Sequence, residues 1–298
     1  MKDFFNNKIK IINLIIFLSF IFYYIFSERE YFYLIRDTSL FLSLVILVML
    51  LFKYIINVYL NILLFQNINI NLNFNEAFKI LYFNRVGNSF GFLKIGSGYK
   101  LNYLINVKKT NLKDYLGITT MYSLLEYILN FFIFFLTYSI FGLEKYKIEL
   151  LLINFSLLFI IFFYKKINHF LYNFIKEKFE INLKLNLINL PSLVLIIFLN
   201  ITINIIIILL IVISVGIEKP VIDIIFYQFS SLLSSLVQIT PGNIGFSEVF
   251  IYLFNNIHTF TFNEILIISI LYRLLNFIFL SFIGIIYKKS IFSQSLFF

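Results

Sequence analysis

Long apolar runs constrain this chain more than any other feature of its sequence. Several runs of about 18 or more mostly apolar residues follow one another, and each is long enough to cross a bilayer as an α-helix. A membrane β-barrel would instead show alternating stretches of about ten residues. Because the chain is also 61% hydrophobic, it has too little polar surface for a soluble domain. The sequence therefore predicts an all-α polytopic membrane protein.

Six of these runs are expected to be full transmembrane helices. They comprise residues 9–26, 39–65, 116–141, 150–164, 190–215 and 265–287. The first run follows several lysines, as a signal peptide does, but it is long for one and lacks a small-residue cleavage site. We therefore expect one transmembrane domain over residues 1–298, divided into halves 1–142 and 143–298.

The basic residues predict which side of the membrane each loop occupies. The N-terminus, residues 66–115, residues 165–184 and the Lys288-Lys289 pair are basic, which is typical of the cytoplasmic side. The net charge of +9 thus reports topology rather than a nucleic-acid partner. We expect a multi-pass protein of the plasma (inner) membrane with both termini in the cytoplasm.

This topology requires two segments to begin and end on the same side of the membrane. Residues 66–115 start and finish inside, and residues 216–264 start and finish outside. Each contains two short apolar stretches joined by a break that contains glycine, "GFLKIGSGYK" and "TPGNIGFSE". Two re-entrant helical hairpins in an inverted repeat would satisfy this pattern. The alternative is that one or both segments cross the membrane completely.

The second break combines a helix breaker, two flexible residues and an acid. Pro241 ends a helix, Gly242 and Gly245 let the chain turn, and Glu248 follows in the next helix. The start of that helix would present unpaired N–H groups inside the membrane, which favours an anion site. Equally, Glu248 could cap its own helix, and the sequence leaves both interpretations open.

The first break has a similar pattern with a basic residue. Gly96 and Gly98 precede Lys100 much as the glycines of the second break precede Glu248. We expect Lys100 and Glu248 to approach each other, or a shared polar cavity, where the hairpin tips meet.

Three further charges fall near the middle of predicted spans. A charge there costs about 2.5–3.5 kcal/mol on the insertion scale, so Lys53, Glu126 and Arg273 should face a cavity or a partner. Glu126 and Arg273 are the expected second pair. Snorkelling toward an interface is the alternative for Lys53 and Arg273.

The sequence predicts neither a metal site nor a cofactor. Cysteine is absent, and His169 and His258 are far apart in expected loops. There is no Walker A loop, dinucleotide fingerprint, HExxH or nucleophile elbow.

The motifs "IGSGYKLNYLINVKKTNLKDYLG", "TPGNIGFSEVF" and "LYRLLNF" together resemble the lysylphosphatidylglycerol synthase transmembrane region family. Asn243 stands where this family usually has glycine, Lys100 where arginine is common, and Tyr127 where arginine follows the acid. The motifs of this resemblance include Gly96, Gly98, Lys100, Pro241, Gly242, Gly245 and Glu248, which we expect to bind the substrate. Glu126 and Arg273 also match the family and, with Lys53, are the expected intramembrane charges.

The resemblance implies a flippase-like protein that moves or handles a lipid with an anionic or glycosylated headgroup. Its partner would be a membrane lipid, together with enzymes of envelope synthesis. The chain ends at Phe298, after the last span, so we expect no synthase domain and no aminoacyl transfer. A membrane-embedded glycosyl or lipid transferase and a non-catalytic scaffold for envelope synthesis remain the alternatives.

Overall fold

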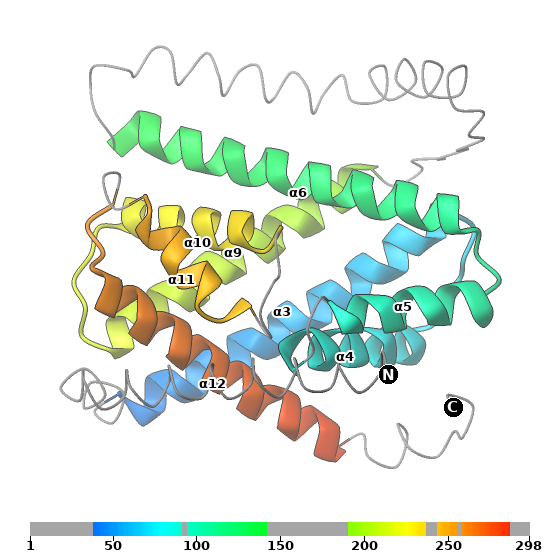
Figure 1. Ribbon diagram of the computed structural model, residues 1–298, viewed down its shortest axis with the longest axis horizontal. Coiled ribbons are helices and arrows are strands. Elements are labelled where there is room, and N and C mark those ends of the chain that lie inside the picture. Colours follow the sequence, from blue (N-terminus) through cyan, green and yellow to red (C-terminus); the bar gives the residue numbers. More distant parts are fainter. Residues whose placement is uncertain (1–37, 91–93, 142–189, 237–242, 255–257, 287–298) are drawn as a thin grey trace, which may run out of the picture.

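All regular secondary structure in the described part of the chain is helical, as the sequence predicts. The computed structural model describes residues 38–90, 94–141, 190–236, 243–254 and 258–286. Figure 1 shows the helices of these ranges packed as one bundle. In chain order they are α3 (Leu40–Gln66), α4 (Phe74–Phe90), α5 (Ile95–Asn106), α6 (Leu112–Phe141), α9 (Leu190–Ser214), α10 (Val221–Ser234), α11 (Phe246–Tyr252) and α12 (Phe262–Ile286).

Four helices, α3, α6, α9 and α12, are long and apolar enough to cross a membrane. They contain 25 to 30 residues each. At about 1.5 Å per residue, each exceeds the roughly 30 Å hydrocarbon core. Their ends lie close to those of the four corresponding predicted spans. The other two predicted spans, residues 9–26 and 150–164, lie outside the described residues.

The four shorter helices form two pairs, and each pair follows a long helix. α4 packs against α5, and α10 packs against α11. Figure 1 shows α4 and α5 toward one end of the bundle and α10 and α11 toward the other. α5, α10 and α11 have 12, 14 and 7 residues, too few to cross a membrane alone. The order long, short, short, long therefore occurs twice in the described chain.

The first short pair is held together by a close approach of two backbones. A Cβ atom at Gly96 would lie 1.9 Å from the carbonyl oxygen of Asn84, and one at Gly87 would lie 2.6 Å from the Cα of Gly96. Only glycine permits this contact. At the open end of the pair, Glu76 at the start of α4 forms an ion pair with Lys108, 2.8 Å away.

The second short pair is fixed at its open end by a similar set of polar contacts. The Asp223 carboxylate on α10 accepts a hydrogen bond of 2.9 Å from the backbone N–H of Thr259. Lys219 lies 2.9 Å from Glu264, which also caps α12 by accepting from the backbone N–H of Thr261. Both pairs are thus tied where the chain enters and leaves them.

The centre of the bundle is the contact between α3 and α9. Buried side chains recur every four residues along α3, at Ile46, Leu50, Tyr54 and Val58. This spacing marks one face of a helix. Apolar side chains on the outer surface of the helix, such as Phe41, remain exposed. α3 therefore has an inner and an outer face even though both are mostly apolar.

Candidate functional site

A ladder of polar side chains lies between the two central helices. Lys53, Asn57 and Asn61 recur every four residues on α3, and Asn200 and Asn204 have the same spacing on α9. The side-chain N–H of Asn57 donates to the amide oxygen of Asn200 over 2.9 Å. Lys53 donates to the amide oxygen of Asn204. The ladder thus brings polar groups into the interior of an apolar bundle.

Lys53 is held inside the bundle rather than extended toward an interface. Besides Asn204, its ammonium donates to the hydroxyl of Tyr272 on α12, 3.0 Å away. Asn204 in turn donates to Gln228 on α10. Three hydrogen bonds therefore link Lys53 on α3, directly or through Asn204, to the helices α9, α12 and α10.

Glu248, the acid of the second break, is buried with a complete set of donors. Its carboxylate is 1% exposed. One oxygen accepts from the backbone N–H of Gly245 at 2.7 Å and from Ser247 at 3.0 Å. The other accepts from Ser269 and lies 2.6 Å from the guanidinium of Arg273. This ion pair joins α11 to α12 inside the bundle.

These contacts show one of the two interpretations of the second break, the capping role of Glu248. Glu248 caps its own helix, because it accepts from the backbone N–H of Gly245, whose φ of +83° favours glycine. The backbone N–H of Gly245 is therefore occupied by the glutamate, and an anion site at this helix start stays a prediction. Pro241 and Gly242 lie outside the described residues.

The partners of the buried charges differ from those expected from the sequence. Glu248 pairs with Arg273 rather than with Lys100. The ammonium of Lys100 instead donates to Asn61 at 2.6 Å and lies 5.0 Å from the centre of the Phe65 ring. Arg273 is consequently not the partner of Glu126.

The glycines of the first break have different surroundings. Gly96 is buried in the contact between α4 and α5, where its lack of a side chain lets the two helices pack closely. A Cβ atom at Gly98 would meet nothing within 4 Å. Among the described residues, no contact of Gly96 or Gly98 indicates that either glycine binds a substrate.

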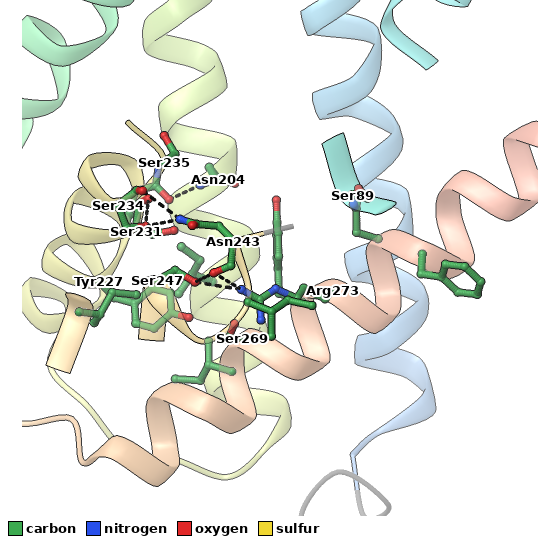
Figure 2. Close-up of a pocket in the computed structure, with 18 of the residues that line it drawn as sticks. Ser89, Asn204, Tyr227, Ser231, Ser234, Ser235, Asn243, Ser247, Ser269 and Arg273 are labelled. Atoms are coloured by element: carbon green, nitrogen blue, oxygen red, sulfur yellow. Dashed lines mark hydrogen bonds between the residues drawn. The ribbon is translucent and has the colours of Figure 1, made fainter. Parts of the chain in front are cut away.

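A cavity of about 400 Å³ lies beside the Glu248–Arg273 pair and is rich in serine. Figure 2 shows Ser89 of α4 across this cavity from the serines of α10, with Arg273 between them. The tips of both short pairs therefore contribute to one polar cavity. We call it the serine-rich cavity, and its polar lining comprises Ser89, Asn204, Tyr227, Gln228, Ser231, Ser234, Ser235, Asn243, Ser247, Ser269, Tyr272, Arg273 and Asn276.

Asn243 has an unusual place in the serine-rich cavity. It has a left-handed backbone with φ +58°, and its side-chain N–H donates to the carbonyl of Ser234 over 2.9 Å. Its amide oxygen is buried and has no hydrogen-bond partner among the described residues. A buried acceptor without a donor is costly, so a ligand that donates here would be stabilised.

A second cavity of about 250 Å³ adjoins the first and carries most of the charge. Lys53, Arg85 and Glu126 line it, together with Tyr122. We call it the basic cavity. It shares four lining residues with the serine-rich cavity: Asn204, Gln228, Ser231 and Ser235.

Reasoning from the sequence missed most of the polar lining. In the sequence, Arg85 is one of several basic residues of the segment 66–115, whose charge predicts only the side of the membrane. A usable signal was present, because Asn57, Asn61, Asn200 and Asn204 have i, i+4 spacing within otherwise apolar spans. The serines at the end of α10 have the same spacing, with Ser231 and Ser235 four residues apart.

Metal ligands do not gather in this region. Within the described ranges, no group of three or more His, Cys, Asp and Glu side chains is placed to hold an ion. His258 has a structural position instead. One ring nitrogen lies 3.1 Å from the carbonyl oxygen of Ile251, and the other accepts from the backbone N–H of Phe260.

Comparison with known families gives one match. The family described as "Lysylphosphatidylglycerol synthase TM region" matches residues 9–284, which is most of the chain. Neither the curated proteins nor the solved structures include a match.

Proposed function

Because the chain belongs to the lysylphosphatidylglycerol synthase TM region family, we propose that it moves the polar headgroup of an anionic or glycosylated lipid between membrane leaflets. Membership of this family alone supports only a membrane protein that is related to lipid handling. The observation that carries the finer proposal is the pair of adjoining polar cavities inside a bundle of apolar helices. Such cavities give a headgroup a polar environment at a depth where lipid offers none.

The position of the two short helix pairs favours a protein that moves the lipid headgroup over one that only binds it. Both contribute to the lining of each cavity, Ser89 and Arg85 from the first pair and Ser231 from the second. In our proposal the pairs are re-entrant hairpins that approach from opposite membrane faces, as halves of an inverted repeat do. Relative motion of the halves would open the cavities to one leaflet and then to the other.

Reconstituted vesicles test this proposal directly. The purified chain is inserted into vesicles that contain a fluorescent phosphatidylglycerol, and a membrane-impermeant quencher reports the outer-leaflet fraction. We expect quenching to proceed beyond the outer leaflet only when the protein is present. Movement no faster than in protein-free vesicles, for phosphatidylglycerol and for glycosylated lipids alike, would contradict the proposal.

The same vesicles distinguish the alternatives. Chemical conversion of the labelled lipid would indicate a transferase, and neither conversion nor movement would favour a scaffold for envelope synthesis. The Gly98→Ala variant is a matched control, because a Cβ atom at this position meets nothing within 4 Å. We expect the variant to move lipid as the original protein does.

A further inference from the structure

We propose that the two cavities bind two parts of one headgroup, a phosphodiester in the basic cavity and an uncharged, hydroxylated group in the serine-rich cavity. This inference rests on the proposed lipid-moving function and names the class of lipid. It also implies that the site discriminates against aminoacylated headgroups, which carry an ammonium group.

The cavities are close enough to hold one molecule. Asn204, Gln228, Ser231 and Ser235 line both of them. A ligand that extends past these four side chains therefore passes from one cavity into the other. In a phospholipid, the phosphodiester is bonded directly to the headgroup, so the two groups lie at the separation that adjoining cavities require.

The charges of the basic cavity favour an anion. Lys53 and Arg85 contribute two positive charges against one carboxylate, Glu126, which leaves an excess of one positive charge. The guanidinium of Arg85 lies 5.1 Å from the centre of the Tyr54 ring. A planar guanidinium can donate two parallel hydrogen bonds to a phosphate. An incoming phosphodiester would therefore neutralise the cavity.

The serine-rich cavity presents groups that suit an uncharged polyol. Hydroxyl and amide side chains both donate and accept, as the hydroxyls of glycerol or a sugar do. The buried oxygen of Asn243, which no described residue contacts by hydrogen bonding, is an acceptor ready for such a hydroxyl. The volume of about 400 Å³ is within the range of small-ligand sites.

An ammonium group would lack a partner in the serine-rich cavity. Arg273 is the charged residue of the lining, and it has the same sign as an ammonium. Its counter-ion, Glu248, is 1% exposed and already accepts from Gly245, Ser247, Ser269 and Arg273. A cationic headgroup would therefore find no uncommitted carboxylate in the lining of the serine-rich cavity.

The serine-rich cavity borders an exposed apolar surface of α12, along which the acyl chains of the lipid can lie. Phe277 lines the serine-rich cavity and is 54% exposed. Leu274, three residues before Phe277, is exposed on the same face, and Ile278 and Phe282 continue the exposed apolar surface from Leu274 at four-residue spacing. The headgroup can thus enter from an apolar surface along which the tails remain in the bilayer.

Competitive binding of five lipids tests the assignment. Native mass spectrometry of the full chain would compare phosphatidylglycerol, phosphatidylinositol, phosphatidylmethanol, glucosyl diacylglycerol and lysyl-phosphatidylglycerol in equimolar mixtures. Phosphatidylmethanol keeps the phosphodiester without hydroxyls, and glucosyl diacylglycerol keeps the hydroxyls without phosphate. We expect phosphatidylglycerol or phosphatidylinositol to bind roughly threefold or more above either single-feature lipid, and roughly tenfold above the lysyl lipid.

Two substitutions assign each preference to its cavity. Lys53→Met should remove the preference for phosphatidylglycerol over glucosyl diacylglycerol, and Lys53→Arg should retain it. Asn276→Leu should instead remove the preference for phosphatidylglycerol over phosphatidylmethanol. Thermal unfolding of each variant shows that the bundle is intact. Equal loss of both preferences in either variant, with a folded protein, would overturn the division between the cavities.

The two proposals fail in different ways. Lipid movement in vesicles without the expected binding order, or with lysyl-phosphatidylglycerol bound most tightly, overturns the headgroup assignment and leaves lipid transport standing. The expected binding order without movement overturns transport, while the assignment of the two cavities to the two groups is retained.

Discussion

At the scale of single residues, the pair of Glu248 and Arg273 has the largest consequences. Both charges lie inside an apolar bundle, and their atoms approach to 2.6 Å. Removing one partner of a buried pair leaves an uncompensated charge and typically costs about 3–5 kcal/mol. Removing both can cost far less, because no lone charge remains. This asymmetry makes the pair testable without a transport assay.

We predict strong coupling between Glu248→Gln and Arg273→Met. Each single variant should lower the free energy of unfolding by about 3 kcal/mol, and the double variant should lose less than the sum. Unfolding of the purified protein in increasing SDS measures all three. Lys100→Met with Glu248→Gln is the matched control cycle, because Lys100 donates to Asn61. We expect additivity within about 0.5 kcal/mol for that control; additivity in the first cycle would contradict the ion pair.

The asparagine ladder allows a second prediction at this scale. Asn57→Leu removes the hydrogen bond to Asn200 and leaves a buried amide oxygen without its donor. The expected loss is about 1–3 kcal/mol in the free energy of unfolding. Replacing Asn200 as well should recover part of it, since neither amide then lacks a partner. Asn106→Leu, at an exposed position of α5, serves as the control and should change stability little.

At the scale of helices, the sequence predicts well where the long helices lie and how long they are. It predicts poorly which side chains of different helices contact each other. α3, α6, α9 and α12 follow from hydrophobicity, which is summed over many residues and survives single exceptions. Which charge meets Glu248 depends instead on the rotation of α12 about its axis and on the course of residues 243–245. Hydrophobicity alone does not determine either quantity. The polar face of α12 formed by Ser269, Tyr272, Arg273 and Asn276 indicates which side turns inward, but not which charge it meets. The Lys100–Glu248 pairing therefore failed although both helices were expected.

The glycines of the first break illustrate the same limit. In the sequence, Gly96 and Gly98 appear equivalent, two residues apart in one glycine-containing segment. In the structure, Gly96 contacts the backbone of α4 and Gly98 contacts nothing there. Their difference arises from the packing of α4 on α5, which the spacing of the glycines in the sequence does not determine.

We predict opposite effects for alanine at these two positions. Gly96→Ala places a methyl group 1.9 Å from the Asn84 carbonyl oxygen, so the helices must separate. Overpacking of this kind costs about 1–3 kcal/mol. Gly98→Ala should leave stability equal or raise it by up to about 1 kcal/mol, since alanine favours helix. Thermal unfolding in detergent measures both, and equal melting temperatures for the two variants would contradict the close contact.

At the scale of the whole molecule, the repeated order of long and short helices suggests two structurally related halves. α3 to α6 and α9 to α12 each comprise a long helix, two short ones and another long one. Figure 1 places the two short pairs toward opposite ends of the bundle, as an inverted repeat requires. Together with the basic character of residues 66–115, this arrangement supports one specific membrane topology.

The topology can be tested by cysteine labelling, because the chain contains no cysteine of its own. Asn71 and Lys113 precede and follow the first short pair, whereas Glu218 and Thr261 precede and follow the second, and all four are exposed. If each pair re-enters, single cysteines at positions 71 and 113 should react only from the cytoplasmic side. Cysteines at 218 and 261 should react with an impermeant maleimide added outside intact cells. Labelling of 71 and 113 from opposite sides would show that the first pair crosses the membrane, and a split between 218 and 261 would show the same for the second.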